Sequence, residues 1–418
     1  MENPTITCLL SLLGCGAETT GPTDAGRDAA TTDAATIDAA TCAPAPATTA
    51  PFMRRTDNPR LRAGTRFGAD VDTTIADPDL LWDDALGQWR GYFLAARGPS
   101  FAGPLTHSIR EMRGGTDGAT WTLFDPPALL ASPSTEAWDH DRTETPTVVV
   151  NPDAPPDRRY LMLYAGAAGT MPGQAFPAYA IGAAFSPDGV TFTRVAAADS
   201  PHGQAGLVLR GTDVYPRADA ALVADPDVVF RDGTYHAWFS SFACAAATTA
   251  CDTVTAFGVA HASSTDGIHW TPDAASPVPS LVRTPGVPTS GGQQPSVVWD
   301  QRHCRYELWL TSDAAGETDV QPAAFNNTMG AWHATSADGA TWSIDFDGAR
   351  DLAWAPGEPG EPLGMLTGVD VAAHGDDRLM LYVGFDDQAV PPDFYLPDRT
   401  PTGFRPGVMA LGVATRGP

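Results

Sequence analysis

Carboxylate side chains stand beside prolines in a short motif that recurs along the chain. Asp77 and Asp225 each directly precede a proline in the triplet Ala-Asp-Pro, and Glu144 lies two residues before Pro146. Glu144 is distinctive because only nine of the 50 acidic residues are glutamates. Carboxyl groups that crowd together acquire different pKa values, so that one can donate a proton while another accepts one. The pattern is therefore compatible with acid–base chemistry at Asp77, Glu144 and Asp225, and equally with acidic side chains that solvate a water-filled channel or hold a cation.

These prolines belong to an internal repeat, which predicts the fold. Four copies of the proline motif and a fifth copy without proline, at 368–371, follow one another at spacings of 68, 80, 69 and 74 residues. A tight turn and a strand-like apolar segment, usually rich in aromatic residues, follow each copy. Four periods then carry an Asp-Gly pair with an aromatic residue four positions after the aspartate: Asp117 and Trp121, Asp188 and Phe192, Asp266 and Trp270, Asp338 and Trp342. Each period reads as four short antiparallel strands, so we expect an all-β chain with a five-bladed β-propeller over residues 51–418.

The last period lacks its Asp-Gly hairpin, and the chain ends soon after the third strand of that period. Residues 52–57, followed by Asn58 and Pro59, resemble the segment that follows the hairpin in the other periods. Pairing between the two ends of the chain would remove an exposed sheet edge. We therefore expect residues near 52–56 to complete the fifth blade.

Loop lengths indicate which face of the propeller carries chemistry. The turns between first and second strands, such as 231–233, are short, whereas the connections between second and third strands are long. In an antiparallel blade the long connections share a face with the start of the first strand, beside the central axis. The residues around each repeat proline should therefore line a pocket on that face, with Gln293 and Gln294 beside the acidic side chains.

Over about residues 55–418 the repeat resembles the five-bladed propeller glycosidases of glycoside hydrolase family 43 and their relatives in family 32. The resemblance implies a base or nucleophile at Asp77, and at Asp225 a residue that orients the acid and tunes its pKa. The general acid of the family is a glutamate two residues before a proline, usually in the fourth blade, where this chain has Gln293. Because an amide cannot donate a proton as an acid does, we expect Glu144 to replace it from the second blade. Sugar contacts by stacking or hydrogen bonding are expected from Arg97, Trp138, Arg142, Tyr215 and Asp386, beside Gln293 and Gln294.

Three functions are compatible with this resemblance. The first is a glycosidase that cleaves an oligo- or polysaccharide by two-carboxylate acid–base chemistry. The second is a glycan-binding protein that has lost catalysis, which the glutamine at position 293 would explain. The third is a propeller that binds protein or mediates adhesion through its long loops. Fold alone does not choose among them.

The beginning of the chain reads as an export signal followed by a linker. In residues 1–15 an apolar run ends in Leu12-Leu13-Gly14-Cys15, which resembles a bacterial lipobox, so Cys15 would be acylated and become the mature N-terminus. A plain secretion signal is the alternative. Residues 16–50 consist largely of Ala, Thr, Asp, Pro and Gly, which predicts a disordered linker. We therefore expect an exported protein that is lipid-anchored at the bacterial cell envelope.

Cysteine positions agree with export. Cys244 and Cys251 flank a short Ala/Thr segment, and we expect a local disulfide between them in an oxidising compartment. The partners of Cys42 and Cys304 stay open.

Charge and composition exclude several classes of function. The chain has 25 basic and 50 acidic residues, a net charge of −25 and no lysine, which argues against binding to nucleic acid or to anionic membrane surfaces. It contains no Gly-rich phosphate loop and no H-E-x-x-H helix, so we expect no cofactor, although a structural Ca²⁺ in a central channel stays open. We expect a monomer that meets the membrane only through its lipid.

Overall fold

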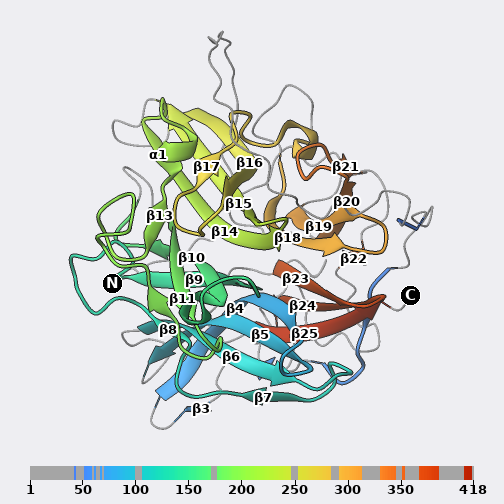
Figure 1. Cartoon of the computed structure of the whole chain (residues 1–418). Coiled ribbons are helices and arrows are strands. Elements are labelled where there is room, and N and C mark those ends of the chain that lie inside the picture. Colours follow the sequence, from blue (N-terminus) through green and yellow to red (C-terminus); the bar gives the residue numbers. More distant parts are fainter. Residues whose placement is uncertain are drawn as a thin grey trace, which may run out of the picture.

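The computed structural model describes residues 42–43, 51–58, 61–62, 66–67, 70–98, 106–170, 177–245, 253–283, 291–312, 330–344, 351–353, 367–385 and 409–416. Within these ranges the chain is almost entirely β-structure and forms five sheets around a central axis (Figure 1). The five sheets follow one another in sequence, one for each repeat. The predicted all-β fold and five-bladed β-propeller are therefore confirmed.

In each blade the strand that carries the repeat motif lies near the axis, and the next two strands of the chain follow it in order toward the rim. Blade one contains β3 (Arg66–Phe67), β4 (Asp70–Asp83), β5 (Gln88–Gly98), β6 (Thr106–Gly114), β7 (Trp121–Leu123) and β8 (Leu129–Leu130). Blade two contains β9 (Arg142–Val150), β10 (Tyr160–Ala167), β11 (Ala180–Ser186), β12 (Thr193–Arg194) and β13 (Leu207–Leu209). The short helix α1 (Gly211–Val214) precedes blade three, which contains β14 (Ala220–Arg231), β15 (Thr234–Ala245), β16 (Thr253–Ser264) and β17 (Thr271–Pro272). Blade four contains β18 (Gln293–Asp300), β19 (Arg305–Ser312), β20 (Gly330–Ser336), β21 (Ser343–Ile344) and β22 (Leu352–Ala353), and blade five contains β23 (Thr367–His374), β24 (Asp377–Phe385), β25 (Met409–Arg416), β1 (Met53–Arg54) and β2 (Leu61–Arg62).

The Asp-Gly hairpins dock each blade onto the one before it. Gly189 has a φ of +73°, which favours glycine, and a Cβ at this position would lie 2.4 Å from Arg90 of blade one. The same packing occurs in blade four, where Trp238 of blade three donates a hydrogen bond to the Gly339 carbonyl at 3.1 Å. The hairpin aromatic Trp342 meets Trp238 edge-on at 5.9 Å between ring centroids. The repeated Asp-Gly hairpins thus form part of the packing between neighbouring blades.

A closed ring of hydrogen bonds joins all five blades at the axis. In each blade, the side chain at the third position of the motif accepts the backbone N–H of a residue in the next blade. The acceptors and donors are Asp79 and Val148, Thr147 and Val228, Asp227 and Val297, Ser296 and Val371, and Asp370 and Leu80. Because every blade both donates and accepts, the ring fixes the first strands, and the residues just before these positions, relative to one another.

The N-terminal segment completes blade five, as the sequence predicts. Met53 of β1 pairs with Thr415 of β25, which makes β1 the outer strand of that blade. Phe52 packs edge-on against Trp309 of blade four at 6.0 Å between ring centroids. Asn58 donates to the Val413 carbonyl and accepts the Val413 N–H, both at 2.9 Å.

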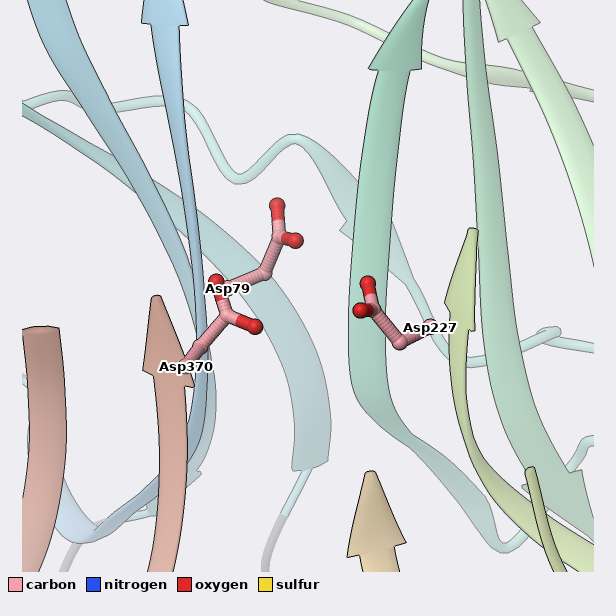
Figure 2. A group of neighbouring side chains, drawn as sticks. All are labelled: Asp79, Asp227 and Asp370. Atoms are coloured by element: carbon pink, nitrogen blue, oxygen red, sulfur yellow. The ribbon is translucent and has the colours of Figure 1, made fainter. Parts of the chain in front are cut away.

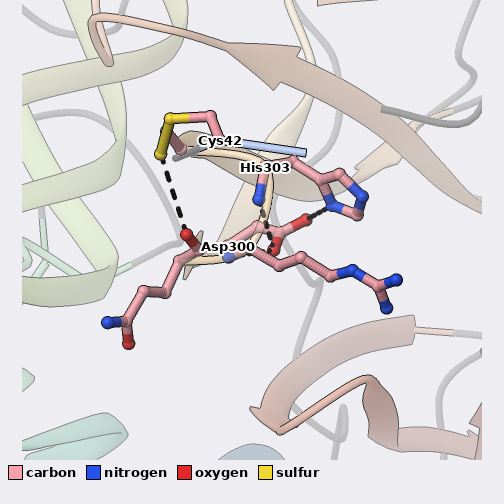
Figure 3. The surroundings of a disulfide bond; sticks show 6 residues. Cys42, Asp300 and His303 are labelled. Carbon is pink, nitrogen blue, oxygen red and sulfur yellow. Dashed lines mark hydrogen bonds and ion pairs between the residues drawn. A yellow bond between two sulfur atoms is a disulfide. The ribbon is translucent and has the colours of Figure 1, made fainter. Parts of the chain in front are cut away.

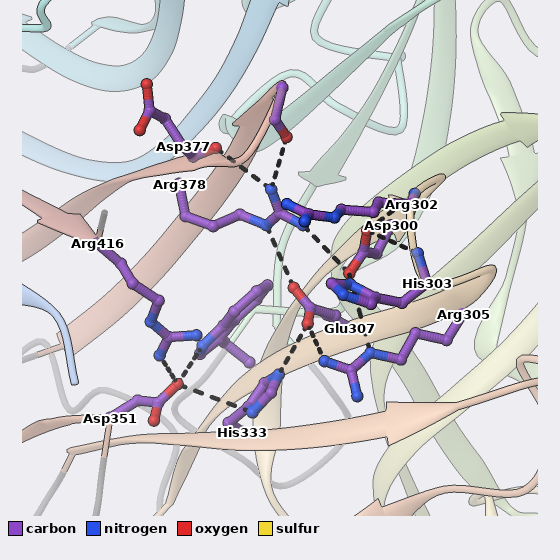
Figure 4. A network of polar contacts seen from close by, with 12 residues as sticks. Asp300, Arg302, His303, Arg305, Glu307, His333, Asp351, Asp377, Arg378 and Arg416 are labelled. Carbon is purple, nitrogen blue, oxygen red and sulfur yellow. Dashed lines mark hydrogen bonds and ion pairs between the residues drawn. The ribbon is translucent and has the colours of Figure 1, made fainter. Parts of the chain in front are cut away.

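Buried ion pairs fill the seam between blades four and five (Figure 4). Arg378 of β24 lies 3.2 Å from Glu307 of β19, and Arg416 of β25 contacts the Asp351 carboxylate, which precedes β22. Both arginine side chains are less than one tenth exposed. Buried pairs of this kind are costly to break singly, because the remaining charge loses its partner.

One disulfide ties the start of the described chain to blade four (Figure 3). Cys42 bonds Cys304 in the turn between β18 and β19, and the Ala43 N–H donates to the Arg302 carbonyl at 2.9 Å. This pairing resolves what the sequence left open, and it places residue 42, within the predicted linker, on the propeller. Cys244 is also disulfide-bonded, but Cys251 lies outside the described residues, so the pairing of these two stays a prediction.

The predicted signal segment 1–15 with Cys15, and most of the predicted linker 16–50, lie outside the described residues. Among the helices of the described part, none has the length and apolar character needed to cross a membrane.

Deleting residues 52–56 should lower the free energy of unfolding by at least about 3 kcal/mol, because the buried Phe52 ring is lost and the edge of β25 is exposed. Deleting five residues within the linker, 28–32, is the matched control and should leave stability unchanged. Denaturant unfolding of both variants measures the difference. Equal stabilities would contradict closure of the ring by the N-terminal segment.

Candidate active site

The residue before each repeat proline adopts the same unusual backbone conformation. Its φ is +49° at Asp77, +45° at Thr145, +48° at Asp225, +52° at Gln294 and +68° at Gly368, where the proline is missing. At the same place, the pairing between first and second strands shifts register in every blade. A bulge of this kind turns a side chain out of the regular strand alternation, and left-handed backbone at non-glycine residues is characteristic of functional sites.

These five residues line one cavity on the axis, with a volume of about 360 Å³ that includes space open to solvent. Asp77 and Asp225 come from blades one and three, and Thr145 and Gln294 from blades two and four. Gln293, at the position of the expected acid, begins β18, is half-buried and is not among the described residues that line this cavity. The repeat thus brings two of the three predicted catalytic carboxyl groups to one cavity.

Glu144 is held as a carboxylate beside this cavity. Nδ1 of His107 and Nη1 of Arg142 each lie 2.8 Å from its Oε1, and the Tyr179 hydroxyl donates to Oε2 at 2.5 Å. Burial acts to raise the pKa of Glu144, but these three partners outweigh burial and lower that pKa to about 2. A general acid needs a raised pKa, so this environment does not suit the acid role that the sequence predicts for Glu144.

The two cavity carboxyl groups show the opposite behaviour. Burial raises the pKa of Asp77 well above its usual value, and the negative charges of Glu144 and Asp225 add to this effect. Burial also raises the pKa of Asp225 to about 6, opposed by a hydrogen bond from Ser240 and assisted by the charge of Glu144. Ser240 Oγ in turn accepts a hydrogen bond from the Gln294 N–H at 2.9 Å, so Ser240 links Asp225 to Gln294 of the next blade. Asp77 and Asp225 are therefore the groups whose proton affinity suits acid–base chemistry near neutral pH.

A second tier of carboxyl groups lies two residues further along the same strands (Figure 2). Asp79, Asp227 and Asp370 are buried, and one carboxylate oxygen of each lies within 4.8 Å of the chosen oxygens of the other two. Burial, followed by their mutual repulsion, raises the pKa values of Asp79 and Asp370, and burial raises that of Asp227 to about 6. Among the described residues, this group could offer oxygens to a cation. The contacts that the structure gives these side chains are the hydrogen bonds that join the blades, so their demonstrated role is structural.

The residues expected to contact sugar are dispersed. Arg142 is engaged with the Glu144 carboxylate. One face of Trp138 is stacked on Tyr164 at 5.7 Å between ring centroids, and its indole N–H donates to the Ala205 carbonyl. The Tyr215 hydroxyl is 2.7 Å from Ser241 Oγ, and Arg97 stands on β5 opposite Thr106.

None of Arg97, Trp138 and Tyr215 is among the described residues that line the cavity, and Asp386 lies outside the described part of the chain. Their roles as sugar contacts stay predictions.

His107 and Tyr179 both touch Glu144, yet neither was predicted from the sequence. His107 is the second residue of β6, and Tyr179 directly precedes β11. Each therefore stands where a long connection enters the third strand of a blade, on the face predicted to carry chemistry. This position was the available signal.

No family model and no curated protein matches the chain, but solved structures do. A structure described as a complex of BT0996 and RGII aligns with a TM-score of 0.57 at 12% identity, over 87% of this chain and 93% of the other. A glycosyl hydrolase from Bacteroides ovatus aligns with a TM-score of 0.52 at 14% identity, over 89% and 95% of the two chains. A structure from glycoside hydrolase family 130, a family of mannoside phosphorylases that contains glycoside hydrolases, aligns with a TM-score of 0.51 at 12% identity, over 89% and 96%. Over 87% to 89% of its length, this chain therefore shares the five-bladed β-propeller fold of these structures.

Proposed function

We propose that the protein is a glycoside hydrolase that cleaves an oligo- or polysaccharide with Asp77 and Asp225. The observation that carries this proposal is the pair of carboxyl groups with raised pKa that face one axial cavity beside an ionised glutamate. Hydrolysis of a glycosidic bond needs one carboxyl group that protonates the leaving oxygen and another that activates water or attacks the sugar. Similarity in fold to glycoside hydrolases, and to a protein solved in an RGII complex, supports a glycan as substrate.

The pKa shifts favour a different assignment of the general acid and the base from the one that the family resemblance implies. Asp77, whose proton is stabilised by burial and by two neighbouring carboxylates, is assigned as general acid. Asp225, with a pKa of about 6, is ionised at neutral pH and is assigned as base or nucleophile. Glu144 has both oxygens occupied by hydrogen-bond donors, so it acts through its charge, which raises the pKa values of the other two. Glu144 thus takes the tuning role expected of Asp225.

This assignment predicts a bell-shaped dependence of kcat/KM on pH. Activity should rise with pH through about 6, because Asp225 must lose its proton to act as a base. It should fall again at higher pH as Asp77 loses the proton that it donates. Initial rates on a cleaved glycoside measure both limbs, and Asp225→Asn should remove the acidic limb together with most of the activity. A wild-type profile that is flat between pH 5 and 7 would contradict the assignment of Asp225.

Screening the protein on arabinosides, xylosides, fructans and mannosides tests the proposal as a whole. Release of reducing sugar from any of them, abolished by Asp77→Asn, is the expected result. If the protein bound a glycan but cleaved none of them, hydrolysis would be ruled out, and the protein would be a non-catalytic glycan-binding propeller.

The proposed location is the bacterial cell envelope, with Cys15 acylated, residues 16–41 as a linker and the protein as a monomer. The disulfide between Cys42 and Cys304 supports an exported protein, because disulfides persist in oxidising compartments. The glycan would then be met outside the cytoplasm.

A further inference from the structure

We propose that His107 is a positioning residue that holds the Glu144 carboxylate in place from the neighbouring blade and thereby sets the charge felt by Asp77 and Asp225. This inference rests on the proposed function, and it identifies a residue that controls the same site.

His107 differs from the other two partners of Glu144 in where it comes from. Arg142 lies on β9, the strand of Glu144 itself, and Tyr179 adjoins β11 of the same blade, whereas His107 lies on β6 of blade one. Strand β6 packs against β9, so the contact of 2.8 Å between His107 Nδ1 and Glu144 Oε1 crosses the seam between blades one and two. Of these three partners, His107 is the one that can transmit the position of blade one to Glu144.

The contact is sheltered, which makes it effective. The side chains of His107 and Glu144 are 14% and 8% exposed. Polar contacts shielded from water are stronger than those on the surface, where solvent screens the charges. Removing the imidazole contact from this carboxylate leaves its negative charge less compensated.

That charge acts on the two cavity carboxyl groups. Glu144 raises the pKa values of both Asp77 and Asp225, while Arg142 acts in the opposite direction on Asp77. Tyr179 and Arg142 stay in contact with Glu144 when His107 is removed, so Glu144 stays ionised and its repulsion of the other carboxylates increases. Loss of His107 should therefore make both Asp77 and Asp225 hold their protons more tightly.

His107→Ala and His107→Gln test this inference, with His140→Ala as the matched control. His140 is a half-buried histidine near the same face whose Nδ1 lies 3.1 Å from the Ser132 carbonyl oxygen and not from a site carboxylate. We expect His107→Ala to move the acidic limb of kcat/KM upward by about half a pH unit and to lower kcat/KM about twofold at pH 6, where less of Asp225 is then ionised. His107→Gln, whose side-chain amide can contact the Glu144 carboxylate, should restore most of the acidic-limb position and most of the rate at pH 6. His140→Ala should change neither the acidic limb nor the rate.

A second measurement does not depend on turnover. With aspartate labelled by ¹³C at the carboxyl group, NMR follows the titration of Asp225 directly, and its midpoint should rise in His107→Ala but not in His140→Ala. An unchanged midpoint in folded His107→Ala protein, or in His107→Gln if the alanine variant does not fold, overturns the inference. Equal loss of activity in both His107 variants with an unmoved acidic limb also overturns it, since His107 would then act as a proton donor itself. If the wild-type protein cleaves no glycan, the proposed function fails, and the NMR midpoint still decides the role of His107.

Discussion

Replacing Asp77 by asparagine is expected to lower kcat by about 10²–10⁴-fold, the usual contribution of a general acid, because an amide cannot supply the proton that the leaving oxygen needs. The substitution is well suited to the site. Asp77 has a φ of +49°, and asparagine is among the residues that tolerate left-handed backbone best. The variant should therefore fold normally, with KM little changed. Steady-state rates and a thermal melt measure the two effects separately.

A matched control for this variant is Asp232→Asn. Asp232 also has left-handed backbone, with a φ of +51°, but it lies in the turn between β14 and β15, at the end of the blade away from the cavity. The control should keep full activity. If Asp77→Asn retained its turnover, Asp77 could not be the general acid. Glycan binding that persists in the variant, when the wild-type protein also shows no turnover, would favour a binding protein.

Replacing Cys304 by serine is expected to lower the free energy of unfolding by about 2–5 kcal/mol, the range found for native disulfides, and toward its upper end because the loop is long. Cys42 and Cys304 are 262 positions apart, so their bond constrains the unfolded chain across four blades. In the folded protein it holds Cys42 against blade four, and Phe52 and β1, whose packing closes the ring, follow Cys42 in the chain. Denaturant unfolding with and without a reducing agent measures the effect.

Several comparisons separate this explanation from a general effect of thiol removal. Cys42→Ser should match Cys304→Ser, and the double variant should be no less stable than either single one, because each change removes the same bond. Limited proteolysis should cut residues 51–58 faster in all three variants. Equal unfolding free energies for wild-type and Cys304→Ser protein under oxidising conditions would show that the bond does not help to close the ring.

Most of the fold could be predicted from the sequence because its signals are local and repeated. The motif around Asp77 recurs at Asp225 with the same neighbours, and the Asp-Gly pairs mark hairpins in four of the five periods. Signals of this kind can be read from a short stretch of sequence, because the residue types in that stretch determine its backbone geometry. The closure of blade five by residues near 52–56 could be predicted for the same reason, since blade five lacks a strand and the N-terminal segment resembles the missing one.

The five blades, the axial position of Asp77 and Asp225 and the unusual residues Glu144 and Gln293 could all be read from the sequence. Which carboxyl group keeps a proton depends on contacts between blades, which the sequence does not reveal. Glu144 contacts His107 of another blade, Arg142 of its own strand and Tyr179 beside another strand, and these three contacts lower its pKa. The pKa of Asp77 is instead raised mainly by burial, and further by the nearby carboxylates of Glu144 in blade two and Asp225 in blade three. The physical reason is that a proton affinity is set by burial and by charges within a few ångströms, and in a propeller those neighbours come from segments far apart in the chain.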